Sequence, residues 1–316
     1  MNQQFATDVR VGLTSSPKKI SSKYFYDEKG SALFSEIMNL PEYYLTNSEF
    51  EIIQTQTREM VKLLGIEQEK YFELIEFGAG DGYKTIEFLK VLEEDNFTYQ
   101  YIPIDISQKA IDQIEGAVDN HFTNLNIAGR KGDYFEVMEE LKGSNTPKVL
   151  LFLGSNIGNM EDDFAHAFLS KLALNLNKGD FLILGTDLKK STEIVLPAYN
   201  DSQGVTSQFN LNLLERMNRE LGADFNIDLF EHFPEYDEKI GVARSSIRSK
   251  TNQTVYLQAI DLSVEFKEGE PIHTEISRKY DDEILTKIMK GTGFEIVGRF
   301  TDQREYFANY IMVKSE

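Results

Sequence analysis

The sequence contains no cysteine in its 316 residues, which excludes disulfides, thiolate metal sites and a cysteine nucleophile. This absence fits a reducing compartment. Histidine is also rare, and none of its four copies has the spacing of a zinc-binding motif, so we expect no metal site. We expect each histidine to be a surface or helix-capping residue: His121, His166, His232 and His273.

Long apolar runs are absent as well. No stretch reaches the roughly 18 apolar residues that would span a membrane, and the N-terminal residues lack the apolar core of a signal peptide. The net charge of −19 opposes binding to nucleic acid and to anionic lipid surfaces. We therefore expect a cytoplasmic protein, monomeric in the simplest case, whose partner is a small molecule.

Only seven prolines are present, and no linker or internal repeat interrupts the chain. Between residues 72 and 184, short apolar runs alternate with helical patterns. This alternation predicts an α/β fold in which helices cover both faces of a parallel sheet. The predicted strands are residues 72–77, 99–104, 149–153 and 181–184, with a weaker one at 125–130, and the predicted helices are residues 85–92, 108–118 and 162–176.

The pattern changes near residue 191. Residues 195–221 are mostly helical, and two later stretches, 255–266 and 270–280, alternate like antiparallel strands with one exposed face. After residue 281 the α/β pattern returns, with a predicted helix at 283–289 and predicted strands at 294–300 and 307–313. We predict N-terminal helices in residues 1–51, an α/β core in 52–190, an insert in 191–279 that forms a second lobe with those helices, and a return to the core sheet in 280–316.

A glycine-rich turn follows the first predicted strand of the core. In IEFGAGDG, the glycines Gly78, Gly80 and Gly82 allow a tight turn and a close approach of the backbone to a ligand. The dinucleotide fingerprint would need a third glycine where Tyr83 stands. The spacing, with Glu76 just upstream, is closer to the pattern of S-adenosylmethionine sites.

Acidic residues follow the next two predicted strands. Asp105 ends the second strand and can accept hydrogen bonds from a ribose diol. Its alternative role is to cap the next helix, a role that Ser107 can also fill. Asp133 can accept from an adenine amine and Tyr134 can cover the ring, although an aspartate after glycine is also ordinary turn chemistry. Gly154 and Asn159 lie in a polar loop after the fourth strand, where a transferred group is expected.

The chain resembles the histidine Nα-methyltransferase family of ergothioneine biosynthesis, whose members convert L-histidine to its trimethyl betaine, hercynine. The resemblance extends along nearly the whole chain through the segments KYFYDEKGSALF, LPEYYLTNSE, IEFGAGDGYKT, LFLGSNIGNM, LGTDL and HTEISRKY. It implies a class I methyltransferase core, a Rossmann-like doubly wound sheet, with a second α+β lobe that binds the substrate. S-adenosyl-L-methionine is the implied cofactor and S-adenosylhomocysteine the implied product.

The resemblance also implies roles for individual residues. The implied cofactor-binding residues are Tyr26, Gly78, Gly80, Lys84, Asp105, Asp133, Tyr134 and Gly154. The implied substrate-binding residues are Phe34, Tyr43, Asn159, Tyr199, Ser245, Glu275 and Ser277. Glu275 and Ser277 stand two positions apart, so on a strand they share a face and can reach both nitrogens of an imidazole. Ser245 stands where the family has a methionine near the imidazole, which predicts a more polar or differently shaped pocket.

Methyl transfer from a sulfonium requires alignment more than stabilisation of new charge. No histidine lies near the predicted loops as an obvious base, so we expect Tyr26, Tyr43 and Asn159 to orient the substrate amine, which releases its proton to water. Alternatives are the same chemistry on another amino acid or small amine, a nicotinamide oxidoreductase, which Tyr83 disfavours, and a non-enzymatic binding module, which the intact cofactor motif disfavours.

Overall fold

The computed structural model describes residues 3–315, which form two compact units. Unit 1 consists of the described part of Met1–Tyr44 together with Lys190–Arg278. Unit 2 consists of Leu45–Lys189 together with the described part of Lys279–Glu316. The chain therefore leaves unit 2 at residue 190, forms unit 1 together with the N-terminal residues, and returns to unit 2 after residue 278.

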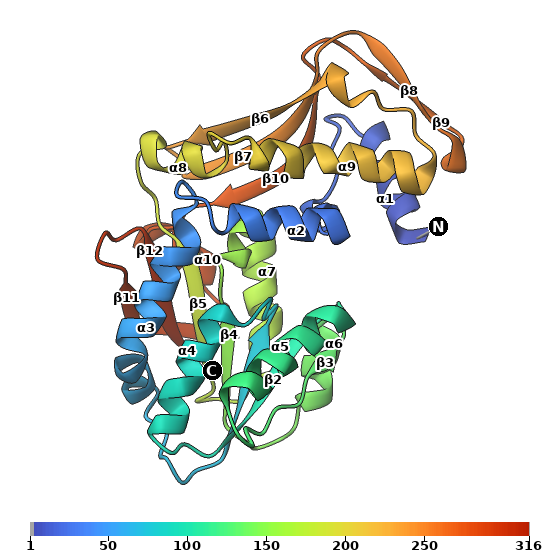
Figure 1. Ribbon diagram of the computed structural model, residues 1–316. Helices are drawn as coiled ribbons and strands as arrows, with labels where there is room; N and C mark the ends of the chain where they lie inside the picture. Colours follow the sequence, from blue (N-terminus) through green and yellow to red (C-terminus); the bar gives the residue numbers. More distant parts are fainter. Residues whose placement is uncertain (1–2, 316) are drawn as a thin grey trace. The chain divides into compact units, whose positions relative to one another are not determined.

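Unit 2 contains a seven-stranded sheet in the order β11-β12-β5-β4-β1-β2-β3 (Figure 1). Strands β1 to β5 pair in parallel, whereas β12 is antiparallel to β5 and β11 is antiparallel to β12. The strands are β1 Phe72–Phe77, β2 Tyr99–Asp105, β3 Arg130–Lys131, β4 Lys148–Phe152, β5 Phe181–Asp187, β11 Phe294–Thr301 and β12 Phe307–Lys314. The sequence prediction of a parallel sheet is thus confirmed for the core strands only.

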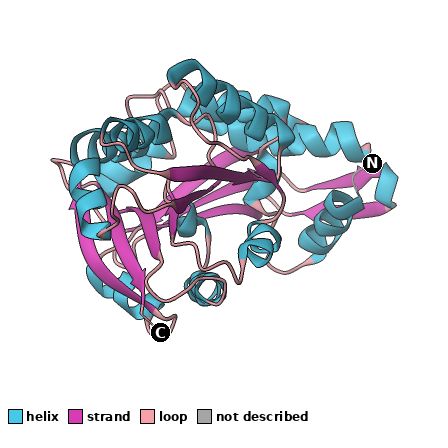
Figure 2. Ribbon diagram, turned by 90° about the horizontal axis from the view of Figure 1, so that it is seen from below, coloured by secondary structure: helices cyan, strands magenta, loops and turns pink. Residues whose placement is uncertain are grey.

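Helices cover both faces of this sheet, as expected from central strands without an exposed side (Figure 2). All five residues of β4 are buried, which requires a packed layer on each face. One layer packs side chains of α6, α7 and α10 against the sheet. The helices are α3 Tyr44–Leu64, α4 Tyr83–Glu94, α5 Gln108–His121, α6 Tyr134–Leu141, α7 Asp162–Ala173 and α10 Asp282–Met289, with the short 3-10 helix η2 Asn156–Asn159.

Unit 1 packs helices against a three-stranded antiparallel sheet, in the order β10-β7-β6, and a separate hairpin. Its core contains Phe25, Phe209, Leu213 and Ile247, all nearly inaccessible to solvent. The elements are α1 Gln3–Thr14, η1 Ser22–Phe25, α2 Glu28–Ile37, α8 Thr192–Ala198, α9 Val205–Leu221, η3 Ile227–Leu229, β6 Phe230–Asp237, β7 Val242–Ser249, β8 Gln253–Leu257, η4 Gln258–Ile260, β9 Leu262–Phe266 and β10 Pro271–Arg278.

Several sequence predictions were incomplete or wrong. The weak strand at 125–130 is only an isolated bridge from Ile127 to Tyr101 followed by the two-residue β3. The helical stretch 195–221 is two helices, because residues between Ala198 and Val205 form turns. Among the α-helices and strands of residues 3–315, α1, α6, β6 and β7 had not been predicted at all, and the stretch 255–266 is the two strands β8 and β9.

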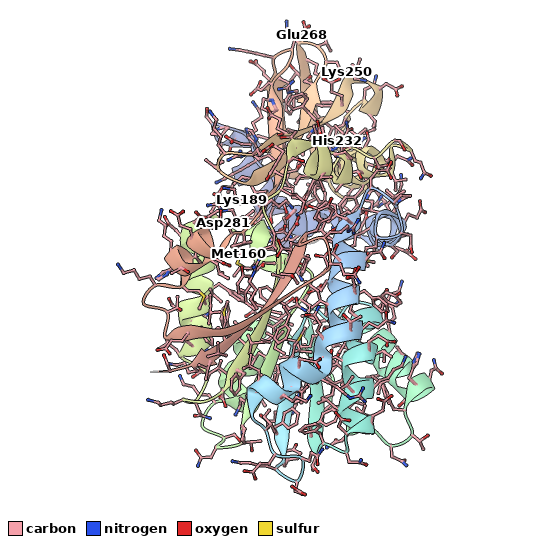
Figure 3. The ribbon with its side chains drawn as sticks, turned by 90° about the vertical axis from the view of Figure 1, so that its left-hand side faces the viewer. Met160, Lys189, His232, Lys250, Glu268 and Asp281 are labelled. Atoms are coloured by element: carbon pink, nitrogen blue, oxygen red, sulfur yellow. The ribbon has the colours of Figure 1, made fainter. Side chains whose placement is uncertain are left out.

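Within unit 2, the segment that precedes residue 190 is joined to the segment that follows residue 278. Leu188 bridges Tyr280, and the Tyr280 N–H donates to the Asp187 carbonyl at 2.8 Å. Lys279 and Asp187 form a fully buried ion pair at 2.6 Å, and Lys189 pairs with Asp281 at 3.3 Å (Figure 3). A buried charge is tolerated only when it is paired, so this contact fixes the two segments to each other.

Replacing Lys279 by methionine should therefore reduce the stability of unit 2 by about 3–5 kcal/mol, because the buried Asp187 carboxylate would lose the ammonium group that pairs with it. Urea unfolding followed by circular dichroism measures the change. Arg58→Met is the matched control, since Arg58 pairs with Glu94 on the surface, where an ion pair contributes little to stability. Equal losses in the two variants would contradict the importance of the buried pair.

Candidate active site

The glycine turn after β1 has the backbone conformation that its sequence predicts. Gly78, Gly80 and Gly82 adopt φ values of 67°, 59° and 73°, the left-handed region that favours glycine. A Cβ at Gly82 would lie 2.0 Å from the Ile114 side chain, and one at Gly78 would lie 2.9 Å from the Tyr134 hydroxyl. Around a Cβ built at Gly80, by contrast, no atom lies within 4 Å, so the backbone there is open to the close approach of a ligand.

Glu76, the acid upstream of this turn, has a structural role. Its carboxylate is buried and accepts hydrogen bonds from the Thr85 hydroxyl, at 2.7 Å, and from the Tyr101 hydroxyl. Burial raises the pKa of the Glu76 carboxyl, and the two hydrogen bonds partly oppose that shift. Since both oxygens already have donors, Glu76 ties β1 to α4 and β2 and does not face a ligand.

Asp105 lies at the end of β2 next to the glycine turn, because the Gly78 N–H donates to the Ile104 carbonyl at 3.0 Å. One Asp105 oxygen accepts from the Ser107 N–H at 2.8 Å. Ser107 itself caps α5, so the alternative role of Asp105 as the cap is wrong. Burial raises the pKa of the Asp105 carboxyl, opposed by the N–H groups of Ser107 and Ile106.

Tyr134 completes this side of the turn. Its ring stacks on Phe77 with centroids 4.6 Å apart and planes 5° from parallel. The pKa of its hydroxyl is raised to about 12. Burial is the largest cause, and the negative charges of Asp105 and Asp133 act in the same direction. Asp133 caps α6, and one of its oxygens accepts from the Phe135 N–H at 2.9 Å. The interpretation of Asp133 as an ordinary turn residue is therefore confirmed. Its second oxygen is still available to a ligand.

The loop after β4 is a second strained turn at the same edge of the sheet. Gly154 and Ser155 have φ values of 75° and 57°, and Asn159 is exposed at the end of η2. The Gly154 N–H donates to the buried carboxylate of Glu49 at 2.8 Å, and Lys84 forms an ion pair with the same carboxylate. Sequence reasoning gave Glu49 no role, although it lies in the segment LPEYYLTNSE.

Four aromatic rings gather in unit 1. Tyr26 contacts Phe34 and Phe209 edge to face, with centroids 5.4 and 5.6 Å apart, and Phe34 contacts Tyr43 at 6.2 Å. Three of these rings come from the predicted site residues, and α9 supplies Phe209. Tyr26 remains 45% exposed, which leaves part of its surface open to a ligand.

The polar site residues of unit 1 lie on β7, β10 and the end of α8. The Tyr199 hydroxyl donates to Ser277 at 2.7 Å, and the Ser245 hydroxyl donates to Glu275 at 3.3 Å. Glu275 faces Ser245 across the sheet, and Ser277 follows two residues later in regular register, so both project from one face as predicted. Burial of its hydroxyl raises the pKa of Tyr26, and the negative charge of Glu275 and then Tyr199 add to this shift.

Three of the histidines are surface or capping residues, as the sequence predicted. His121 is exposed at the end of α5. His166 and His232 are partly buried and bond to carbonyls at the ends of α10 and α8, those of Ile288 and Tyr199, each at 2.8 Å. His273 fits neither role, because it is partly buried on β10 and its ring lies 3.2 Å from the Ser246 hydroxyl. Among residues 3–315 no three His, Cys, Asp or Glu side chains gather in a way that suits a metal ion. In the same range, no helix has the length and apolarity needed to cross a membrane.

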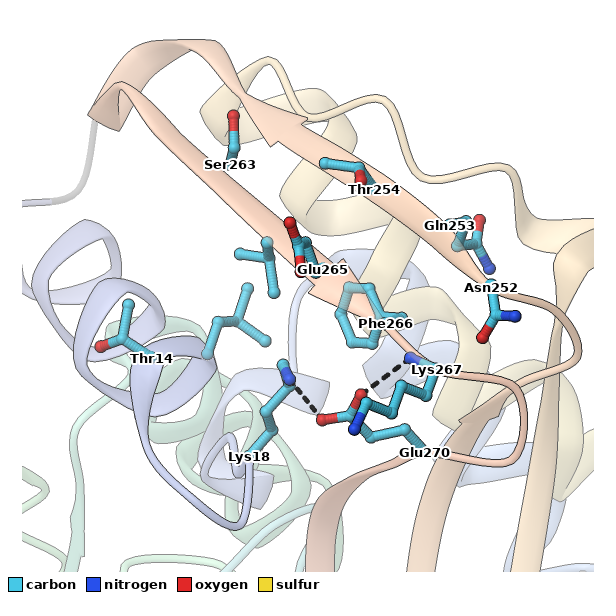
Figure 4. A pocket seen from close by; sticks show the side chains of 12 residues that line it. Thr14, Lys18, Asn252, Gln253, Thr254, Ser263, Glu265, Phe266, Lys267 and Glu270 are labelled. Atoms are coloured by element: carbon cyan, nitrogen blue, oxygen red, sulfur yellow. Dashed lines mark hydrogen bonds and ion pairs between the residues drawn. The ribbon is translucent and has the colours of Figure 1, made fainter.

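A groove of about 720 Å³ lies elsewhere in unit 1, between α1 and the β8–β9 hairpin (Figure 4). Its walls include Leu13, Phe266 and the ion pair of Lys18 with Glu270. None of the predicted site residues lines it. The chemistry is therefore expected at the clustered residues described above and not in this groove.

Comparison with known proteins gives a match along almost the whole chain. Residues 5–314 match the family described as histidine-specific methyltransferase, SAM-dependent. The chain is 35% identical to histidine N-alpha-methyltransferase of Mycolicibacterium smegmatis, covering 97% of this chain and 94% of that protein. It is 27% identical to ergothioneine biosynthesis protein 1 of Schizosaccharomyces pombe, covering 94% and 39%. A solved S-adenosylmethionine-dependent methyltransferase from Clostridium acetobutylicum aligns with TM-score 0.45 and 10% identity, covering 84% and 92%.

Asp105→Asn should weaken binding of S-adenosylhomocysteine about tenfold or more, because hydrogen bonds to a charged acceptor contribute roughly 1.5–3 kcal/mol. Titration calorimetry measures the loss. In the unaltered chain, affinity should fall on acidification, starting above the usual aspartate range because the pKa of Asp105 is raised and protonation removes an acceptor. Asp112→Asn is the control, since Asp112 on α5 only accepts from Gln108 at the surface. Undiminished affinity in Asp105→Asn would contradict the ribose assignment.

Proposed function

The chain belongs to the family of histidine-specific, S-adenosylmethionine-dependent methyltransferases, and from that membership we propose that it methylates the α-amino nitrogen of L-histidine, up to the trimethyl betaine hercynine. Unit 2 has the doubly wound, Rossmann-like sheet of a class I methyltransferase. The proposed product belongs to ergothioneine biosynthesis, which fits the names of the relatives. The observation that best supports histidine as the substrate is the joint position of Glu275, Ser277 and Tyr199 in unit 1.

The residues at the ends of β1, β2 and β4 fit S-adenosylmethionine. The bare backbone at Gly78 and Gly80 suits the methionine part of the cofactor, and the free acceptor capacity of Asp105 suits its ribose hydroxyls. Tyr134 and Asp133 lie next to that position and would bind the adenine. Lys84 and Gly154 would complete the site near the transferred group. When bound, the cofactor supplies an electrophilic methyl group and leaves as S-adenosylhomocysteine.

Unit 1 offers groups that match an amino acid with an imidazole side chain. The Glu275 carboxylate accepts hydrogen bonds only, whereas the Ser277 hydroxyl can both donate and accept, so the pair complements the N–H and the bare nitrogen of a neutral imidazole. Phe34 and Tyr43 would line the ring. Tyr199 would hold the substrate carboxylate, and the resemblance assigns the same group to Asn159, which belongs to unit 2.

Ser245 already donates to Glu275 in this chain. The same chemistry on another amino acid or small amine remains the alternative substrate assignment, because this hydroxyl makes the pocket more polar than the methionine typical of the family.

The described side chains include no evident strong base for the substrate ammonium. The pKa of Tyr26 is raised, so its hydroxyl stays protonated near neutral pH and can orient the amine but not accept its proton. The His232 ring donates a hydrogen bond to the Tyr199 carbonyl, and burial lowers the pKa of this ring. We infer that Tyr26, Tyr43 and Asn159 align the nitrogen lone pair while the proton leaves to water, so alignment supplies most of the rate acceleration.

Mass spectrometry of L-histidine incubated with the protein and S-adenosylmethionine tests this proposal. Products heavier by one, two and three methyl groups are expected, with the trimethylated form accumulating. Fragmentation should place every methyl group on the α-nitrogen. Absence of methylated histidine, together with methylation of another amino acid in a mixture, would move the assignment to the alternative substrate.

Tyr199→Phe removes the hydroxyl that donates to Ser277 and should raise KM for histidine about fivefold to tenfold, in line with one lost hydrogen bond of roughly 1 kcal/mol. KM for S-adenosylmethionine should be unchanged, because Tyr199 is not among the residues assigned to the cofactor. Tyr256→Phe is the matched control: its hydroxyl bonds Asp261 on the exposed hairpin and should affect neither constant. A change confined to KM for the cofactor would contradict the assignment.

Tyr26→Phe should lower kcat without moving the apparent pKa in a plot of rate against pH. The reason is that the raised pKa of Tyr26 keeps its hydroxyl protonated in both the resting and the reacting enzyme between pH 6 and about 9. Initial rates at saturating cofactor across this range provide the measurement. Loss of a titration step in the variant would identify Tyr26 as a base and refute the alignment mechanism.

A further inference from the structure

Glu49 on α3 is a carboxylate that the predicted cofactor site does not explain. Its side chain is completely buried, although an ionised carboxylate is costly to remove from water. One of its oxygens accepts from two groups at once, the Lys84 ammonium and the Gly154 N–H, the latter at 2.8 Å. All three residues belong to unit 2.

These two partners come from separate parts of the cofactor site. Lys84 follows the glycine turn in the first turn of α4, and Gly154 begins the strained loop after β4. Both are residues that we assign to S-adenosylmethionine. Glu49 is therefore a single anchor that holds a cation from one loop and a backbone donor from the other.

The sheet leaves room for this anchor at Gly185 of β5. A Cβ at Gly185 would lie 2.2 Å from the second oxygen of Glu49, so any larger residue would displace the carboxylate. That second oxygen is buried and has no hydrogen-bond partner. An incompletely bonded buried charge destabilises a fold, and such groups persist mainly where function requires them.

The Gly154 loop needs such an anchor because its conformation is unfavourable by itself. Ser155 has φ of 57°, in the left-handed region that is unfavourable for a non-glycine residue. The loop is held by the Asp187 N–H, which donates to the Ser155 hydroxyl at 2.9 Å, and by Tyr280, which donates to the Ile157 carbonyl at 3.2 Å. Glu49 provides the charge-assisted bond at the start of the loop.

We propose that Glu49 is a positioning residue for the cofactor: its bonds to the Lys84 ammonium and the Gly154 N–H hold the Lys84 side chain and the Gly154 loop in the arrangement that binds S-adenosylmethionine, without contacting the reacting atoms. This inference rests on the proposed function, since it concerns the same cofactor site. Without the carboxylate, the flexible Lys84 side chain and the strained loop would have to be ordered by the cofactor itself, which lowers affinity.

The test is calorimetric titration of S-adenosylhomocysteine into Glu49→Gln. This change keeps the size of the side chain and removes its charge. Kd should rise at least tenfold, whereas KM for histidine should change less than twofold. If Glu49→Gln is too unstable for titration, Glu49→Asp keeps the charge but shortens the reach, and a smaller rise in Kd, of at least threefold, is expected.

Glu73→Gln is the matched control. Glu73 on β1 pairs with the buried Lys148 on β4 at 3.6 Å. This pair lies at the start of β1 and β4, whereas Gly154, a partner of Glu49, follows the end of β4. It should reduce thermal stability while Kd for S-adenosylhomocysteine stays within twofold of the unaltered chain. If Glu49→Gln behaves the same way, Glu49 is only structural and the inference is overturned.

A double-mutant cycle with Lys84→Gln separates positioning from general destabilisation. If Glu49 acts through Lys84 as well as through Gly154, the loss of affinity for S-adenosylhomocysteine in the double variant should be clearly smaller than the product of the two single losses. Independent, multiplying losses would overturn the inference. Failure of the unaltered chain to bind would instead overturn the proposed function and this inference with it, so the two failures are distinguishable.

Discussion

The parallel pairing of β1 with β2 and β4 is the constraint on which the candidate active site depends. Because the three strands run in the same direction and in register, their carboxyl ends bring Gly78, Asp105 and Gly154 to one edge of the sheet. Each strand then turns through a conformation that its own residues permit, at Gly78 and Gly154 by positive φ. The order and direction of the strands therefore determine where the candidate binding groups lie, and the individual side chains add specific contacts.

Buried polar contacts keep these loops in place. Glu76 joins β1 to α4 and β2, Glu49 joins α4 to the loop after β4, and Lys279 with Asp187 joins the two segments where the chain leaves and re-enters unit 2. Each contact buries a charge that only its partners make tolerable. Unit 2 therefore combines an apolar core that provides stability with a few charged contacts that fix loop geometry, whereas in unit 1 a neutral hydrogen bond joins Tyr199 to Ser277.

Sequence reasoning predicted the core strands, the glycine turn and the facing of Glu275 and Ser277, because these depend on local pattern and strand periodicity. It missed β6 and β7. The first contains Pro234, which only an edge strand accommodates, and the second buries serines that a hydrophobicity pattern assigns to the surface. Glu49 was missed for a related reason: on a helix with many polar residues, only packing reveals which acid is buried. The position of α1 was readable from its spaced apolar residues but was not predicted.

The most direct test of this account is a crystal structure with S-adenosylhomocysteine and L-histidine both bound. The account predicts ribose hydroxyls within hydrogen-bond distance of Asp105, backbone contacts from Gly78, and an imidazole that contacts Glu275 and Ser277. Ligand density away from these residues, or an imidazole bound by other side chains, would contradict it.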